Sequence, residues 1–291
     1  MAQKHNRRRR RKKKNKFKRF VRSLINRPLI LIIAAIVIIG LIVFGAVSCS
    51  NKSKNISTHN TTGDFSSAES LDETKWTTEN GFMKYDDSAY TSTIGIDVSE
   101  WSEDIDWQKV KDAGVDFVIL RVGYRGYETG KFVIDTKLEE YMTGAEAVGL
   151  KMGAYFVTQA ISEEEAIEEA ELVLEKVEGH EMAMPLYIDC EANGGTTSRT
   201  DSLTMQDYTD NAKAFCKRIE EAGYKAGVYS NETWINKNLD LEQLYDYDIW
   251  FAKYTTTPST SHLFNMWQYT EEGEISGIEY WVDVNVRVDK D

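Results

Sequence analysis

The 291-residue chain is poor in the residues that build thiol and metal sites. It has three cysteines and four histidines, and it has no Cys-x-x-Cys pair. The histidines are scattered, at His5, His59, His180 and His262. Zinc sites and Cys/His nucleophile pairs need such residues in clusters, so we predict no metal and no organic cofactor. Three cysteines also exclude a disulfide framework.

Basic residues are scarce after residue 27. The first 27 residues hold fourteen Lys or Arg and no acid, whereas the whole chain has 35 basic and 47 acidic residues. The remainder therefore carries 21 basic against 47 acidic side chains, a net charge of −26. A domain with this charge does not bind nucleic acid or anionic lipid non-specifically. We expect no nucleic-acid partner.

Residues 28–47, "PLILIIAAIVIIGLIVFGAV", form the one long apolar run. Twenty residues at the helical rise cover about 30 Å, the thickness of a bilayer's hydrocarbon core. The basic flank favours a cytoplasmic tail at 1–27, a transmembrane helix at 28–47 and an extracellular remainder. We therefore predict a single-pass protein of the cell membrane. The run is long for a signal peptide, but lipidation at Cys49 of "AVSC" stays open as another anchor.

Residues 48–90 are rich in Ser, Thr, Asn, Asp and Lys and have few aliphatic side chains. This composition is typical of a spacer. Trp76 and Phe82 could pack on a neighbouring domain, but we interpret the segment as an unstructured extracellular linker. The domain that follows is predicted at 91–291.

Short β-branched runs alternate with helical patterns from residue 93 onward. The predicted strands are 94–98, 117–122, 151–157, 185–190, 225–230, 249–254, 266–269 and 281–286. The predicted helices are 106–113, 136–147, 163–177 with Ser162 as N-cap, and 204–222. Eight strands with helices only among the first five indicate an α/β fold, a (β/α) barrel whose last three strands lack helices. A doubly wound open sheet is the alternative.

Carboxylates recur at the strand ends, where such barrels hold their chemistry. Asp97 closes the first strand, Asp189 and Glu191 of "PLYIDCEANGG" close the fourth, and Asp283 lies in the last. Because side chains alternate along a strand, Asp189 and Glu191 share one face and Cys190 takes the other. Like charges buried together keep at least one carboxyl group protonated, which is what a general acid requires. A single such acid would more often be a solvated strand end.

Cys190 should then face the helix layer, near Cys216 on the next predicted helix. We expect two buried free thiols there, although the sequence leaves a disulfide open.

Aromatic residues also gather at the strand ends. Singly they are ordinary core or rim residues, but together they would line a groove for flat sugar faces. The predicted binding set is Tyr124, Tyr155, Tyr229, Tyr254 and Trp267, with Gln268 and Asn285 as hydrogen-bonding groups.

Six ordered blocks carry a family resemblance across 94–286. They are "GIDVSEW…IDWQKVKDAGVDFVILRVGY", "GLKMGAYF", "PLYIDCE", "EEAGYKAGVYSN", "IWFAKY" and "MWQYTEEGEISGIEYWVDVNV". The sequence resembles the glycoside hydrolase family 25 muramidases, the N,O-diacetylmuramidase type of lysozyme. The resemblance implies a modified TIM-like (β/α)5(β)3 barrel. It also implies cleavage of the β-1,4 bond between N-acetylmuramic acid and N-acetylglucosamine in peptidoglycan.

By motif, Glu191 matches the proton donor of that family and Asp189 its partner, while Asp97 and Asp283 match the other two acids. The second catalytic role stays open between an enzyme carboxylate and the substrate's own acetamido group oriented by Asp189. Glu103 stands where the family commonly has Gly, which puts the shape of that loop in doubt. A glycosidase of chitin-like specificity and a non-catalytic wall-binding module are the alternatives; the oligomeric state is not indicated.

Overall fold

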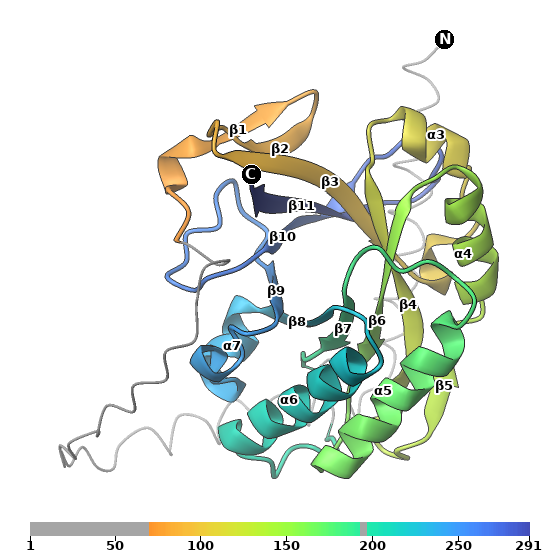
Figure 1. The fold of residues 1–291 in the computed structure, drawn as a ribbon, viewed down its shortest axis with the longest axis vertical. Helices are drawn as coiled ribbons and strands as arrows, with labels where there is room; N and C mark the ends of the chain where they lie inside the picture. The colour runs from red at the N-terminus through yellow and green to blue at the C-terminus, as the bar shows by residue number, and fades with distance from the viewer. Residues whose placement is uncertain (1–69, 193–196) are drawn as a thin grey trace, which may run out of the picture. The chain divides into compact units, whose positions relative to one another are not determined.

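The computed structural model describes residues 70–192 and 197–291. Eight strands in this part form a closed barrel (Figure 1). They are β3 (Tyr90–Val98), β4 (Phe117–Arg125), β6 (Lys151–Val157), β7 (Leu186–Asp189), β8 (Ala226–Asn231), β9 (Asp248–Ala252), β10 (Met266–Gly273) and β11 (Val282–Lys290). The first strand, β3, pairs with both β4 and β11. This pairing closes the sheet, so the open-sheet alternative is wrong.

The last strand runs against its neighbours. The pairs from β3 through β10 in sequence order are parallel, whereas β11 is antiparallel to both β10 and β3. The beginning of β11 therefore lies at the end of the barrel where the other strands finish. The sequence pattern did not indicate this reversal.

Helices cover the outside of the first strands. They are α3 (Trp107–Asp112), α4 (Leu138–Ala147), α5 (Glu163–Val177), α6 (Met205–Glu221) and the short α7 (Glu232–Asn238). The predicted N-cap of α5 is confirmed, because the Ser162 hydroxyl accepts from the backbone N–H of Glu165. The helix α7 was not predicted; its signal is Asn231, whose side chain accepts from the Trp234 N–H. Three single turns, η1 (Glu73–Lys75), η2 (Glu100–Ser102) and η3 (Leu241–Gln243), complete the helical elements.

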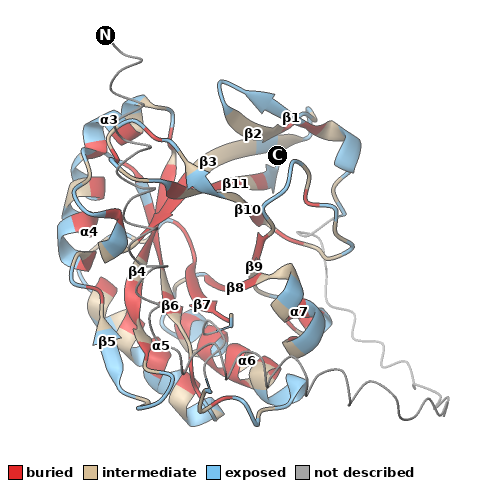
Figure 2. Cartoon of the chain, turned by 180° about the vertical axis from the view of Figure 1, so that it is seen from behind, coloured by how far each residue is buried: buried red, intermediate tan, exposed pale blue. Residues whose placement is uncertain are grey.

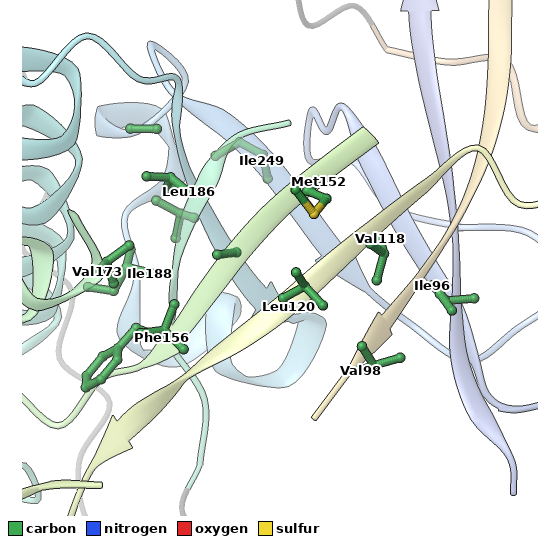
Figure 3. Packing of buried hydrophobic residues seen from close by; sticks show 14 of the residues in the cluster. Ile96, Val98, Val118, Leu120, Met152, Phe156, Val173, Leu186, Ile188 and Ile249 are labelled. Carbon is green, nitrogen blue, oxygen red and sulfur yellow. The ribbon is translucent and has the colours of Figure 1, made fainter. Parts of the chain in front are cut away.

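Alternation along the strands makes two cores. Outward side chains such as Val118, Leu120 and Phe156 pack toward the helices (Figure 3). Inward side chains form a second cluster, which consists of Phe117, Ile119, Met184, Tyr187, Tyr229, Trp250, Ala252 and Met266. The central parts of the barrel strands are accordingly buried on both faces, whereas much of the exposed surface lies on the helices, the loops, the hairpin and β5 (Figure 2).

Polar contacts join strands at the far end of the barrel. Asp248 accepts from the Tyr187 hydroxyl at 2.9 Å and from Arg287 Nη1 at 2.7 Å. The predicted acids lie at the opposite end, where the parallel strands finish. We call that end the mouth.

The predicted linker is partly wrong. A hairpin of β1 (Trp76–Glu79) and β2 (Phe82–Tyr85) lies within it and packs beside β3 and β11 (Figure 1). Trp76 is buried against Trp267, with 5.1 Å between the ring centroids. The hairpin shields the outer face of strands that have no helix, so folded structure is present before the boundary predicted at 91. A short strand, β5 (Phe132–Ile134), extends the sheet beyond β4.

Cys190 and Cys216 are both buried free thiols. Cys190 lies in the outer core rather than in the barrel interior, as alternation predicts, and burial raises the pKa of both thiols. The expectation of free thiols is confirmed.

The predicted tail at 1–27 and span at 28–47 lie outside the described residues. Within 70–192 and 197–291, no helix is both long and apolar enough to cross a bilayer.

Candidate active site

The structure brings the four predicted acids together at the mouth. Asp97 and Asp283 are register partners on β3 and β11, because the reversal of β11 carries its first residues to the mouth. Asp189 is the last residue of β7, and Glu191 follows two residues later. The negative charge of Asp97 helps to raise the pKa of both. The four carboxyl groups therefore form one electrostatic cluster.

Asp97 is held by two side-chain amides. Its Oδ1 accepts from Gln268 Nε2 at 2.8 Å and from Asn285 Nδ2 at 2.9 Å. Burial raises the pKa of Asp97 to about 6, although the two amides and a hydrogen bond from Asp283 oppose the rise. Burial and the charge of Asp97 raise the pKa of Asp283 to about 9. At neutral pH, Asp283 therefore holds a proton and donates it in a hydrogen bond to an ionised Asp97.

The oxygens of both amides are also engaged within the protein. Asn285 Oδ1 accepts from Trp250 Nε1 at 2.8 Å, and Gln268 Oε1 accepts from the Tyr229 and Tyr254 hydroxyls, each at 3.0 Å. Asn285 is fully buried and Gln268 nearly so. In the free protein these two residues orient Asp97, and the donors behind them fix which way each amide points; that they bind substrate stays a prediction.

The Asp189–Glu191 pair is different. Asp189 is 3 % exposed, and its Oδ1 is buried without a hydrogen-bond partner among the described residues. Burial and the charge of Glu191 raise the pKa of Asp189 well above its usual range, whereas Arg121 opposes the rise. Burial, followed by the charge of Asp97, raises the pKa of Glu191 to about 6. Because both carboxyl groups are buried and coupled to each other, Asp189 and Glu191 share one proton.

Tyrosines line the mouth above the acids. Tyr155 and Tyr229 pack edge-on against Trp250, with centroids 5.9 and 4.5 Å apart. Tyr254 is half exposed at the rim. A shift in the pairing of β4 with β6 between Arg121 and Gly123 turns Tyr124 to the inner face. These four predicted residues lie where a groove for sugar would be.

Trp267 does not. It is fully buried in the outer core against Trp76, and its Nε1 donates to the Lys253 carbonyl. Its neighbours Met266 and Gln268 take the inner face, so alternation sends Trp267 outward. The assignment of Trp267 to the sugar groove is wrong.

Arg121 is a site residue that sequence reasoning missed. Its Nε donates to Asp135 at 2.8 Å and its Nη2 to Glu100 at 3.2 Å. The guanidinium carbon lies 6.0 Å from the centre of the Tyr124 ring. The sequence does contain a signal for it: Arg121 is a charged residue within an apolar strand, on the same face as Phe117 and Ile119.

The loop after β3 also shows the consequence of Glu103. Glu103 has φ 58° and ψ −139°, a conformation that suits Gly and strains other residues. The Tyr141 hydroxyl donates to its carbonyl. The departure from Gly therefore leaves the turn in place under strain.

Comparisons with known proteins agree with this architecture. The family model described as glycosyl hydrolases family 25 matches residues 96–278, more than half of the chain. The chain belongs to glycosyl hydrolases family 25. It is thus a glycoside hydrolase by family, and within its described residues no group of three or more His, Cys, Asp or Glu side chains is placed to hold a metal ion.

Individual relatives are distant in sequence. The uncharacterized protein YegX of Escherichia coli K12 is 27% identical over 196 residues, which cover 66% of this chain and 68% of that protein. The autolytic lysozyme of Clostridium acetobutylicum is 23% identical over 192 residues, 66% of this chain and 54% of that one.

Among solved structures, the modular autolysin LytC of Streptococcus pneumoniae superposes with a TM-score of 0.61 at 25% identity. The match covers 72% of this chain and 51% of LytC, so the chain spans about half of that autolysin. A family 25 glycosyl hydrolase from Bacillus anthracis gives 0.57 at 24% identity, with 69% and 90% covered, and supports the fold.

Proposed function

We propose that this family 25 protein cleaves the β-1,4 bond between N-acetylmuramic acid and N-acetylglucosamine in peptidoglycan, with Glu191 as general acid and Asp189 as its partner. Several relatives are lysozymes or autolysins by name, and one LytC structure contains a synthetic peptidoglycan ligand. The acids of the site form a cluster that is lined by tyrosines. This lining fits a glycan better than a charged polymer.

The observation that carries the mechanism is the Oδ1 of Asp189, which has no hydrogen-bond partner among the described residues. A buried acceptor without a donor costs free energy, about 1–3 kcal/mol for an ordinary polar group and more for a charged one. The N–H of a 2-acetamido group is a donor of the required kind. When it occupies this position, it favours the ionised form of Asp189 and leaves the shared proton on Glu191.

The bond-breaking step then follows. Glu191 donates its proton to the glycosidic oxygen, and the acetamido carbonyl oxygen attacks the anomeric carbon, which gives a cyclic oxazolinium-like intermediate. Asp189 stabilises its positive charge. Water then attacks the anomeric carbon and gives its proton to Glu191, which restores the acid. Ionised Asp97, held by its two amides, adds negative charge beneath the reacting sugar.

The products of purified peptidoglycan digested with the full-length chain test the assignment. Muramic acid at the new reducing end, identified by mass spectrometry, is the expected result. N-acetylglucosamine at that end, or preferential cleavage of chitin oligomers, would assign another specificity. Binding without any cleavage would make the protein a wall-binding module.

We further propose that residues 28–47 anchor the enzyme in the cell membrane, with the basic tail inside and the barrel outside. The proposal rests on the charge asymmetry of the sequence. Protease added to intact cells should remove the barrel and leave the tail. A protected barrel would refute export, whereas an acylated Cys49 at the mature N-terminus would replace the helix by a lipid anchor.

A further inference from the structure

Arg121 is a charged group at the mouth to which the proposed mechanism gives no role. It lies in β4, two residues after the inward-facing Ile119, so alternation turns it inward as well. Its register partner on β6 is Tyr155, which pairs in turn with Tyr187 on β7, two residues before Asp189. Arg121 and Asp189 therefore face the same cavity from strands two places apart, a separation of about 10 Å along the sheet.

Two carboxylates hold the guanidinium of Arg121 in place. Its Nε donates to Asp135 Oδ2 at 2.8 Å, and its Nη2 donates to Glu100 Oε1 at 3.2 Å. Asp135 Oδ1 is itself held by the backbone N–H of Lys137 at 3.0 Å. Glu100 Oε2 is held by the Thr136 hydroxyl at 2.8 Å. Because the guanidinium has a fixed direction, it loses less conformational freedom on binding a ligand than an unpaired side chain would.

One nitrogen of this guanidinium is unused. Arg121 Nη1 makes no hydrogen bond with the described residues, and 11 % of the side chain is exposed. Arg125, four residues later on the same strand, is different: its Nε donates to Glu169, its Nη1 to the Gly130 carbonyl and its Nη2 to the Glu165 carbonyl. All three nitrogens of Arg125 are thus engaged on the helix side of the strand, whereas Arg121 offers a fixed donor at the mouth.

The proposed place of the acetamido group indicates what this donor meets. In the proposed complex, the N–H of the 2-acetamido group lies against Asp189 Oδ1. Muramic acid differs from N-acetylglucosamine by a lactyl group on the oxygen of C3, the ring carbon next to C2. The lactyl group therefore leaves the sugar beside the acetamido group, in the part of the cavity next to Asp189. Arg121 is close to that part: burial and the charge of Glu191 raise the pKa of Asp189, and the positive charge of Arg121 opposes the rise.

The charges at the mouth decide which form of the lactyl group is favoured. Arg121 is already paired with two carboxylates. Ionised Asp97 and the Asp189–Glu191 pair, which shares one proton, add further negative charge. A lactyl carboxylate would bring another charge of the same sign, which costs free energy in a buried site. In a strand that bears stem peptides, the lactyl carbonyl belongs to a neutral amide, whose oxygen accepts a hydrogen bond without added charge.

We propose that Arg121 is a specificity-determining residue: its Nη1 donates to the amide carbonyl oxygen of the peptide-bearing lactyl group of muramic acid. The inference deepens the proposed function and rests on it, because it takes the acetamido group to lie at Asp189. It makes the substrate class a glycan strand that carries peptides, rather than a bare strand or a chitin-like oligomer.

Affinities for defined glycans test the proposal without cleavage. The first glycan is a tetrasaccharide of alternating N-acetylglucosamine and N-acetylmuramic acid with L-alaninamide linked to each lactyl group. The second is the same tetrasaccharide with unsubstituted lactyl carboxylates, and the third is an N-acetylglucosamine tetramer. Calorimetry with the full-length Glu191→Gln protein should show the first bound about 10- to 100-fold more tightly than the third, as one hydrogen bond from a charged donor provides. The second should lose most of this gain. Equal affinities for the first and third glycans, or tightest binding of the second, would overturn the proposal.

Variants of the two arginines on β4 locate the contact. In the same background, Arg121→Gln should reduce the preference for the first glycan over the third to within about twofold. If the unpaired Asp135 prevents that variant from folding, Arg121→Lys keeps a charge for Asp135 without the fork of nitrogens, and it should lose most of the preference. Arg125→Lys is the matched control and should keep it. A preference that survives in a folded Arg121 variant would assign the lactyl contact to another group, such as the Tyr155 hydroxyl, and would refute the proposal.

Hydrolysis of purified peptidoglycan separates this inference from the proposed function. If wild-type enzyme cleaves peptidoglycan but the first and third glycans bind equally, only the role of Arg121 is refuted. If wild-type protein does not cleave, yet the preference depends on Arg121, the hydrolase function is refuted and the binding site stands.

Discussion

Two pairs of acids share one cavity but differ in how the protein treats them. Asp97 accepts from Gln268, Asn285 and Asp283, so its hydrogen bonds are complete in the free enzyme. Asp189 has a buried oxygen with no donor among the described residues. The protein itself supplies the hydrogen bonds of the first pair, Asp97 and Asp283. In the second pair, Asp189 and Glu191, one buried acceptor is left for a donor of the substrate. The difference predicts where mutation should damage chemistry and where it should change charge and stability.

The largest effect should come from Glu191→Gln. The amide keeps the shape and can hydrogen bond, but it has no transferable proton. Turnover of peptidoglycan should fall by at least about 10²–10⁴-fold, with glycan binding largely kept. Cys190→Ser is the matched control, since Cys190 lies between the two acids in sequence and faces the helices; it should retain activity. Substantial turnover by Glu191→Gln would remove the general acid from this pair.

Asp189→Asn should be the next most damaging change. The amide cannot supply the negative charge that stabilises the intermediate, so we expect a loss of about 10²–10³-fold, the cost of removing one group that stabilises a transition state. A glycan whose muramic acid lacks the N-acetyl group removes the proposed nucleophile, and wild-type enzyme should be nearly inactive on it. A covalent glycosyl-enzyme on any of the four acids, detected by mass spectrometry, would instead show an enzyme nucleophile.

Much of this pair could be predicted from sequence, because alternation alone places Asp189 and Glu191 on one face and Cys190 on the other. Most strands and helices were predicted to within a few residues for the same reason: their periodicity is strong. The reversal of β11 left no such trace, because a strand has the same alternation in either direction. The mouth position of Asp283 was therefore supported by the family motif rather than by strand pattern.

The errors share another physical cause. Trp267 was assigned to the sugar groove by its place at a strand end, but its partner Trp76 lies in a segment whose polar composition indicated a linker. A two-stranded hairpin needs few apolar residues when the barrel supplies the other half of the contact. For Gln268 and Asn285, sequence shows that polar groups are present but not that Trp250, Tyr229 and Tyr254 already donate to their amide oxygens.

Asn285→Leu tests whether the amide donors to Asp97 hold its pKa down. Hydrogen bonds to charged groups contribute about 1.5–3 kcal/mol, which corresponds to roughly one to two pKa units. Removing one donor should raise the pKa of Asp97 above its present value of about 6, and the acid limb of kcat/KM should move to higher pH by about that amount. Val286→Ala, on the same strand but in the outer core, should lower stability without moving this limb. An unmoved limb in Asn285→Leu would mean that Asp97 is not the group titrating there.

Asp283→Asn should have the smallest effect on turnover, and its effect should appear instead in the pH dependence of stability. The folded-state pKa of Asp283 is about 9, raised first by burial and then by Asp97, whereas the ordinary value is 3.8. Between these values the folded chain binds a proton that the unfolded chain releases, so this group's contribution to stability falls as pH rises from about 4 to 9. Asparagine is neutral throughout and can still donate to Asp97. The Tm of Asp283→Asn relative to wild type should therefore increase steadily over that range. Thermal unfolding at four or five pH values measures the difference. A difference that stays constant with pH would show that Asp283 is ionised in the folded enzyme, and the two acid pairs would then not differ in the way described.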